Sequence, residues 1–271
     1  TNADVTVSLS TGGTGTEGTD YSTISDITIS AGSTTGTASF TPTDDSVYEG
    51  DETAVVSISG VSGGSATESG TQSVTITINE NESAPTVTLT TSATSIDENS
   101  GSVLTLTATL SNATTADVTV SIATSGTASE GTDYTDGSGN IDDIVISAGN
   151  TSETISFRPT DDSVYEGDET ATISISGVSG GSATESGTQA VSITISENES
   201  APTVTLAVSA TSIAENSGST LTLTATSSVV ADEDITVSIS TSGTATEGTD
   251  YGTISDITIS AGDSTGTATF D

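Results

Sequence analysis

Basic side chains are almost missing from this sequence. The chain has one arginine, Arg158, and no histidine against 38 Asp and Glu residues, so its formal net charge is -37. Proteins that bind nucleic acid neutralise its phosphates with Lys and Arg, and anionic membrane surfaces attract the same residues. The composition therefore excludes nucleic acid as a partner and argues against an anionic membrane. Water, salt or bound cations must neutralise the carboxylates.

Cysteine, methionine and tryptophan are also absent. Without cysteine there is no disulfide. Without cysteine and histidine the usual zinc, copper and haem sites cannot form, and thiol enzymes and serine hydrolases with a histidine base are excluded. No apolar run has the length of a transmembrane helix, so membrane insertion is not expected.

Apolar side chains are few, at 31% of the residues, but they are regularly placed. Val, Ile and Leu alternate with Thr and Ser, and a period of two is typical of strands. The 28 glycines separate these runs as turn residues do. The pattern predicts an ordered all-β protein, although low hydrophobicity with high net charge is usually typical of disorder.

Internal repetition is the strongest feature of the chain. Residues 44–70 recur at 161–187 with 25 of 27 identical, and the motif EGTDY ends at Tyr21, Tyr134 and Tyr251. We predict three repeats: residues 1–83, which lack the first two strands, a complete repeat at 84–200, and residues 201–271, truncated at the C-terminal end. We also expect the chain to be a window on a longer array.

Seven strands are expected in the complete repeat. They centre on residues 87–89, 104–110, 118–122, 144–146, 155–157, 171–175 and 191–195. Short alternating strands without helical periodicity predict an immunoglobulin-like sandwich of two antiparallel sheets. A single barrel is the alternative. The fold class is therefore all-β, with tandem sandwiches of about seven strands each.

Acidic residues gather in alternate loops of this predicted sandwich. Successive antiparallel strands reverse direction, so the loops after the first, third and fifth strands share one end with the segment after the seventh. Seven carboxylates fall there: Glu98, Asp133, Asp161, Asp162, Glu166, Glu197 and Glu199. Clustered carboxylates repel one another, and Ca²⁺ accepts six to eight oxygen ligands in irregular geometry. The sequence predicts a calcium site, whereas solvated acids are the alternative; Asp143, Glu153 and Glu185 are interpreted as solvated.

The motifs IDENSG, GTASEGTDY, PTDDSVYEGDET and ITISENE together resemble the Calx-β domain family. That family is known from sodium–calcium exchangers, an integrin subunit and large bacterial surface proteins, and its calcium-binding members hold the ions at one end of the sandwich. The family often closes with consecutive Asp residues, where this chain has ENE. By resemblance, the ligands implied in the other repeats are Asp20, Asp44, Asp45, Glu49, Glu80 and Glu82 in the first, and Glu215, Asp250 and Asp271 in the third. Asp271 is matched to the first Asp of the DD pair.

The linkers between repeats contain no glycine, and each ends with a proline, Pro85 or Pro202. Proline fixes its own φ and biases the preceding residue toward extended backbone. We therefore predict short, semi-rigid linkers that carry their glutamates directly into the proposed ion cluster.

Near-identical repeats suit mechanical extension better than specific recognition. The sequence predicts a calcium-stiffened stalk, fibre or extender of a bacterial extracellular or cell-surface protein. Its expected partners are calcium, neighbouring repeats and other copies of the chain, and strand exchange between chains is left open. The alternatives are an adhesive module for glycan, ice or another surface, and a regulatory calcium sensor. An enzyme is not expected, because the acid clusters recur at repeat junctions and no pocket-forming insertion is visible.

Overall fold

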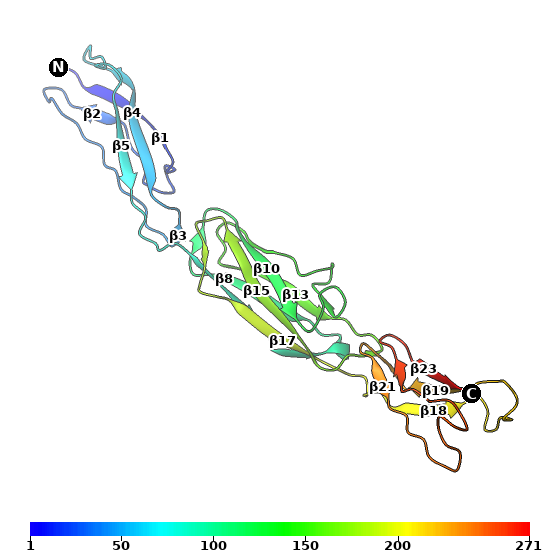
Figure 1. Ribbon diagram of the computed structural model, residues 1–271. Helices are drawn as coiled ribbons and strands as arrows, with labels where there is room; N and C mark the ends of the chain where they lie inside the picture. Colours follow the sequence, from blue (N-terminus) through cyan, green and yellow to red (C-terminus); the bar gives the residue numbers. More distant parts are fainter.

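The computed structural model describes all 271 residues as three bodies in a row (Figure 1). Repeat 1 (residues 1–83) and repeat 3 (residues 201–271) lie at opposite ends of this rod, and repeat 2 (residues 84–200) lies between them. The only helix is a three-residue 3-10 turn, η1 (Glu98–Ser100). The all-β prediction is therefore confirmed, and no helix is long and apolar enough to cross a bilayer.

Repeat 2 is a sandwich of two five-stranded sheets. One sheet has the order β12 (Ile144–Ile146), β10 (Val118–Gly126), β15 (Glu169–Ser179), β17 (Ala190–Ser196) and β7 (Ser95–Asp97). The other has the order β11 (Tyr134–Thr135), β13 (Ser152–Pro159), β8 (Leu104–Leu110), β6 (Thr86–Thr91) and β16 (Thr184–Glu185). All seven predicted strands are present, and the sandwich is confirmed over the barrel. Two short edge strands differ from the prediction, because β7 runs parallel to β17 and β16 runs parallel to β6.

The core of repeat 2 comprises 21 buried residues from both sheets. Alternate residues of each strand point inward; for example, Val118 and Val120 are fully buried on β10, as is Ile173 on β15. Burying one such side chain contributes about 1.5–3 kcal/mol. Beside the acidic end, Tyr134 stacks on Phe157 with ring centroids 4.8 Å apart. The period-two pattern thus builds one continuous core.

A bulge in β10 gives one acidic residue a structural role. The register shifts between Ser121 and Ile122, and the Ile122 amide donates to Asp143 Oδ1 at 2.9 Å. Ser121 Oγ donates to Oδ2 of the same carboxylate at 2.9 Å. Asp143 therefore satisfies backbone that the bulge leaves unpaired, which goes beyond the predicted role of a solvated acid. Asp26 does the same at the corresponding bulge of repeat 1, and Asp256 accepts the equivalent Ile239 amide in repeat 3.

The outer repeats contain different halves of this sandwich. Repeat 1 forms one sheet, in the order β2 (Ile27–Ile29), β1 (Val5–Gly13), β4 (Glu52–Ser62) and β5 (Ser73–Ile78). These strands correspond to β12, β10, β15 and β17. Repeat 3 contains the opposite sheet, β18 (Val204–Val208), β19 (Leu221–Ser227) and β23 (Thr265–Phe270), which corresponds to β6, β8 and β13. It also has a separate two-stranded ribbon, β21 (Ile235–Val237) with β22 (Ile257–Ile259).

Short parallel ladders join neighbouring repeats. In the acidic loop of repeat 1, β3 (Val47–Tyr48) pairs with β9 (Ala113–Thr114) of repeat 2. In the same way, β14 (Val164–Tyr165) of repeat 2 pairs with β20 (Val230–Ala231) of repeat 3. The acidic loop of each repeat is therefore hydrogen-bonded to the next repeat, so the linker is not the only connection between them.

Replacing Gly126 by alanine should destabilise the chain strongly. Gly126 has φ +128°, and a Cβ there would lie 2.0 Å from the Thr170 carbonyl oxygen. We expect Gly126→Ala to cost about 3 kcal/mol or more, combining backbone strain with a clash, as measured by urea unfolding. Gly149→Ala is the matched control, because Gly149 has φ +79° but open space around it; strain alone should cost about 1–2 kcal/mol. If the two variants lose the same free energy of unfolding, the predicted clash between a Cβ at position 126 and the Thr170 carbonyl oxygen is wrong.

Candidate metal centre

Two carboxylate clusters lie at the end of repeat 2 that meets repeat 3. One comprises Glu98, Glu197 and Glu199, and the other comprises Asp133, Glu166 and Glu169. Repeat 1 has a corresponding cluster of Asp20, Glu49 and Glu52. Within each cluster, one carboxylate oxygen of each residue lies within 4.8 Å of the others. Each cluster thus presents three oxygen ligands to a single point.

Five segments of repeat 2 position these side chains. Glu98 opens the 3-10 turn after β7, and Asp133 immediately precedes β11. Glu166 follows β14, and Glu169 is the first residue of β15. The linker glutamates follow β17. The loops converge because alternate connections of the sandwich end on the same side, as the strand order predicts.

Glu197 binds the acidic loop and its own linker through backbone amides. Its Oε2 accepts hydrogen bonds from the amides of Glu166 (2.6 Å) and Gly167 (2.9 Å). Its Oε1 accepts from Asn198 and Glu199, each at 2.8 Å. Burial raises the pKa of Glu197, but these bonds outweigh it and lower the pKa to about 2. Glu197 is therefore an ionised anchor that ties the linker to the loop.

The pKa values of the neighbouring glutamates shift in the opposite direction. Burial raises the pKa of Glu98 to about 7; a hydrogen bond from the Asp162 amide opposes this shift, and the charges of Glu197 and Glu199 add to it. Burial and the charge of Asp133 likewise raise the pKa values of Glu166 and Glu169 to about 7. When all three carboxylates of a cluster are ionised, their surroundings do not fully stabilise the negative charge. Binding of protons or of a cation would reduce this charge.

The donor set fits a hard cation. Glu199 Oε2 and Glu52 Oε2 are buried and accept no hydrogen bond, so each leaves a lone pair free inside a cluster. All the side-chain ligands are oxygen atoms, since the chain has no histidine or cysteine. Carboxylate oxygens gathered at loop ends are ligands that calcium accepts. The clusters therefore could hold a metal ion.

All seven acids predicted in repeat 2 are brought to this end. The Asp162 amide donates to Glu98 Oε1 at 3.3 Å. A hydrogen bond with the Glu197 side chain is the largest cause of the raised pKa of Glu199, followed by burial and by the charges of Glu197 and Asp161. Sequence reasoning missed Glu169 and its counterpart Glu52, which complete two of the clusters. The signal was the i to i+3 spacing of Glu166 and Glu169 within the motif YEGDE. That these residues bind metal stays a prediction.

The acids predicted in repeat 1 are also brought together. Burial, followed by the charges of Asp20, Glu52, Asp45 and Glu80, raises the pKa of Glu49 to about 7. The linker there repeats the arrangement around Glu197. The Glu80 side chain accepts hydrogen bonds from the backbone amides of Glu49 and Gly50. Asn81 Nδ2 donates hydrogen bonds to the side chains of Asp44 (3.0 Å) and Glu82 (3.3 Å).

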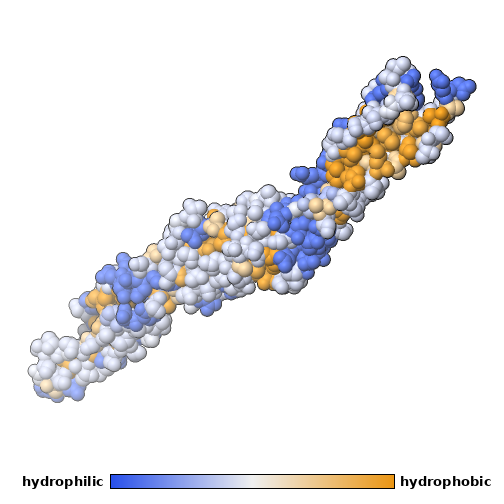
Figure 2. Space-filling view, turned by 90° about the horizontal axis from the view of Figure 1, so that it is seen from below, coloured by the Kyte–Doolittle hydropathy of each residue, from blue (hydrophilic) through white to orange (hydrophobic).

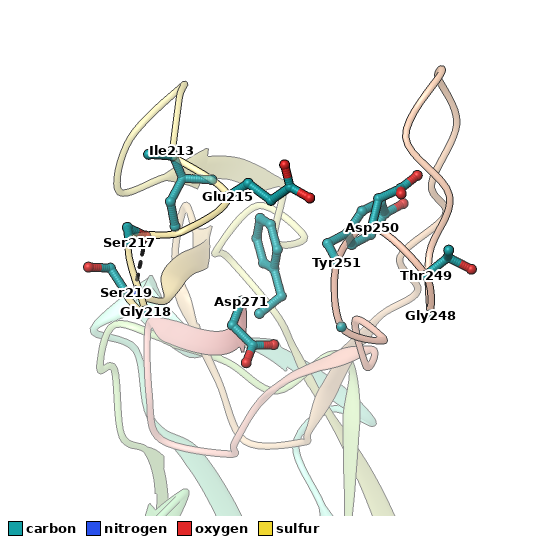
Figure 3. A pocket seen from close by; sticks show the side chains of 13 residues that line it. Ile213, Glu215, Ser217, Gly218, Ser219, Gly248, Thr249, Asp250, Tyr251 and Asp271 are labelled. Carbon is teal, nitrogen blue, oxygen red and sulfur yellow. Dashed lines mark hydrogen bonds between the residues drawn. The ribbon is translucent and has the colours of Figure 1, made fainter.

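The acids predicted in repeat 3 line one open pocket of about 680 Å³ (Figure 3). Glu215 and Asp250 extend into it from two facing loops, and Asp271 lies at its base. They form no cluster of three carboxylates within 4.8 Å. The match of Asp271 to the DD pair is wrong. Phe270 pairs with Leu221 as Phe157 pairs with Leu104, so Asp271 occupies the position of Arg158.

The second junction adds a carboxylate from the following repeat. The Asp232 amide donates to the Tyr165 carbonyl at 3.3 Å. The Asp232 charge adds a smaller contribution to the raised pKa values of Glu166 and Glu169, after burial, Asp133 and other carboxylates of repeat 2. By the register of the two ladders, Thr115 occupies this position at the first junction. The second junction thus has an extra carboxylate from the following repeat beside the cluster that both junctions share, and it also has the cluster of Glu98, Glu197 and Glu199, which repeat 1 lacks.

The sequence pattern of the Calx-beta domain matches residues 1–82, 80–199 and 197–259, which confirms the resemblance. No curated protein sequence matches the chain. Among solved structures, the apo form of the Calx CBD1 domain is 20% identical, with 43% of this chain and 99% of that chain covered and a TM-score of 0.34. CBD12 from CALX1.2 is 16% identical, with coverages of 72% and 88% and a TM-score of 0.33. The calcium binding domain CBD12 of CALX1.1 is 15% identical, with the same coverages and a TM-score of 0.30.

Proposed function

The chain belongs to the Calx-beta domain family, and from this premise we propose that its acidic clusters bind calcium and thereby fix each repeat against the next. The protein is then a structural spacer, not an enzyme. The observation that carries this proposal is the position of the clusters. The cluster of Asp133, Glu166 and Glu169 and its counterpart in repeat 1 each include a residue, Glu166 or Glu49, that directly follows the strand of the ladder to the next repeat.

Calcium would act on residues that already connect the two bodies. Glu197 ties the linker to the loop that contains Glu166, and Glu166 directly follows the β14 strand of the ladder. A cation held by Glu166, Asp133 and Glu169 would remove the repulsion that opposes this arrangement. When bound, the ion supplies positive charge, while the protein residues set the position of the loop and linker. An ion present at a hundred times its dissociation constant stabilises the form that binds it by about 2.7 kcal/mol.

We propose a stalk or fibre segment of a bacterial extracellular or cell-surface protein as the setting. The rod-like arrangement of the repeats supports this role (Figure 1), as do the near-identical junction sequences. The net charge of -37 also suits a compartment rich in divalent cations. Calcium modules that work outside cells bind with dissociation constants of about 0.1–1 mM, and sites of that strength would remain filled there.

Calorimetric titration of the chelator-treated full chain with Ca²⁺ tests the proposal. We expect binding with a dissociation constant at or below about 1 mM. Glu166→Gln with Glu169→Gln should remove binding at the cluster that these residues form with Asp133 and retain it at the first junction. Glu153→Gln is the control, because Glu153 is exposed on β13 and outside the clusters. No heat of binding and no calcium retention at millimolar concentration would refute the calcium assignment.

A further inference from the structure

The ladder at the second junction brings one residue of repeat 3 beside the acidic loop of repeat 2. Strands β14 and β20 run parallel, and their last pair is Tyr165 with Ala231. The next residues along the two strands are Glu166 and Asp232. The Asp232 amide donates to the Tyr165 carbonyl at 3.3 Å, so hydrogen bonding between the two strands continues beyond the last pair and holds Asp232 beside Glu166.

The register directs the side chains of Glu166 and Asp232 to the same side of the ladder. Successive residues of a strand point to opposite faces, whereas residues side by side on neighbouring strands point to the same face, with the strands about 4.8 Å apart. Glu166 forms a cluster with Asp133 and Glu169. The register therefore points Asp232 of the following repeat toward this cluster.

The electrostatics of the junction agree with this placement. Burial is the largest cause of the raised pKa values of Glu166 and Glu169, carboxylates of repeat 2 follow, and Asp232 of repeat 3 also contributes. Figure 2 shows hydrophilic residues gathered where the middle body meets the right-hand body, which is repeat 3 in Figure 1. Negative charge from two repeats thus meets at one place.

The acids that follow Asp232 have other positions. Asp234 Oδ1 accepts the Ala261 amide at 2.8 Å, so this carboxylate holds a turn of its own repeat. Glu233 points away from Asp232, because the side chains of successive residues alternate. Asp232 is therefore the acid of this segment that the ladder aims at the cluster.

The cluster alone offers fewer oxygens than calcium accepts. Asp133, Glu166 and Glu169 each present one carboxylate oxygen within 4.8 Å of the others. Calcium takes six to eight oxygen ligands at about 2.3–2.6 Å, so two ligand oxygens of one ion lie at most about 5 Å apart. Two adjacent parallel strands can place a carboxylate each within that separation.

We propose that Asp232 is a further ligand of the cation held by Asp133, Glu166 and Glu169, so that residues of two consecutive repeats bind one ion. This inference rests on the proposed calcium binding and adds a residue to it. At the first junction, Glu49 occupies the position of Glu166, and Thr115 that of Asp232. A hydroxyl carries no charge, and the affinity of calcium sites depends on the number of charged ligands.

A ligand from the following repeat couples calcium binding to the contact between the repeats. By linkage, the ion strengthens the contact by the same factor by which the contact strengthens binding of the ion. Asp232 then has opposite effects in the two states. Without a cation its charge repels the cluster, and with a cation it helps to hold repeat 3 in place.

Calcium titration of the chelator-treated full chain, followed by amide hydrogen exchange at Tyr165 and Ala231, tests this inference. In wild type, protection should rise with a midpoint at or below about 1 mM. Asp232→Asn keeps the size of the side chain and removes its charge, and it should raise the midpoint about tenfold. Because Asp232 is exposed, this variant should fold, which thermal unfolding in chelator verifies.

Glu233→Gln is the matched control, because it removes the same charge from the adjacent exposed residue. Its midpoint should equal that of wild type at about 0.15 M salt, where charges separated by more than about 8 Å are largely screened. Thr115→Asp is the reciprocal variant. It should lower the midpoint at Tyr48 and Thr114 of the first junction about tenfold.

The outcomes separate this inference from the proposed function. If calorimetry and exchange both show no calcium binding in wild type, both proposals are wrong. If wild type binds calcium and Asp232→Asn has the same or a lower midpoint, calcium binding stands and Asp232 is not a ligand. An equal shift in Glu233→Gln would likewise overturn the inference, because charge near the junction would then account for the effect. So would calcium binding that leaves the ladder unprotected.

Discussion

Removing calcium should loosen the junction between repeats 2 and 3 more than the junction between repeats 1 and 2. Asp232 of repeat 3 lies beside the cluster of Asp133, Glu166 and Glu169, where its charge adds to the repulsion. Thr115 occupies the same position at the first junction and carries no charge. Without a cation, the second junction therefore holds a carboxylate of the following repeat that repels this cluster, in addition to a second cluster of its own.

Amide hydrogen exchange at the two inter-repeat ladders measures this difference. In chelator, we expect protection at Tyr165 and Ala231 to fall about tenfold further than at Tyr48 and Thr114, equivalent to about 1.4 kcal/mol. Calcium should restore both ladders. Small-angle scattering should show the matching increase in flexibility.

Exchanging one residue between the junctions provides the matched control. Asp232→Thr should make the second junction less sensitive to chelator. The reciprocal Thr115→Asp should make the first junction more sensitive. If amide protection at the two ladders in chelator is the same in both variants as in the wild type, repulsion by this residue does not control the junction.

In chelator, the chain should be more stable at pH 5 than at pH 8. The pKa values of Glu49, Glu98, Glu166 and Glu169 are raised from 4.5 to about 7, with burial as the largest cause. Between these two values the folded chain binds more protons than the unfolded chain. Stability is therefore present at the lower pH and is lost as the pH rises through this window.

At lower pH, the stability of the chain should change with pH in the opposite direction. The pKa values of Glu80 and Glu197 are lowered to about 2, because backbone hydrogen bonds outweigh the effect of burial. Their contribution is present above pH 4.5 and is lost as the pH falls toward 2. In chelator, the greatest stability should therefore lie near pH 5, with a net charge less negative than at neutral pH.

Thermal unfolding at both pH values measures this effect. In chelator, the melting temperature should fall by about 5 °C between pH 5 and pH 8. Glu166→Gln with Glu169→Gln should flatten this dependence, whereas Glu153→Gln should not. With calcium the trend should reverse, because the ligands must be deprotonated to bind the ion. A melting temperature that rises from pH 5 to pH 8 in chelator would contradict the assigned protonation.

Strand positions in repeat 2 were predictable because buried residues alternate with more exposed ones along the central part of the strands. Val118 and Val120 point inward, and the threonine between them does not. The convergence of Glu98, Asp133 and Glu197 was also predictable, since chain reversal alone decides at which end a loop lies. Both predictions depend on features that repeat along the chain and require no knowledge of distant contacts.

The remaining features depend on contacts that the local sequence does not encode. Glu169 faces the cluster because β15 begins inside the acidic loop, and a strand boundary is uncertain by about two residues from sequence. Asp271 was matched to the wrong aspartate because the register of β23 is set by its pairing with β19. The ladder at Val164 and Tyr165 spans two residues, too few for any periodic pattern to be visible.

The parallel pairing of β7 with β17 has a mechanical consequence. The chain enters repeat 2 through β6 and β7 and leaves it directly after β17, and three residue pairs join these two edge strands, from Thr194 opposite Ser95 to Ser196 opposite Asp97. When the ends of the repeat are pulled apart, load that passes β6 draws the two parallel strands past each other lengthwise. The hydrogen bonds between them then share the force and must break together, whereas an antiparallel hairpin opened from its free end breaks them one at a time. A strand of three residues therefore resists tension along the rod once the load has passed β6.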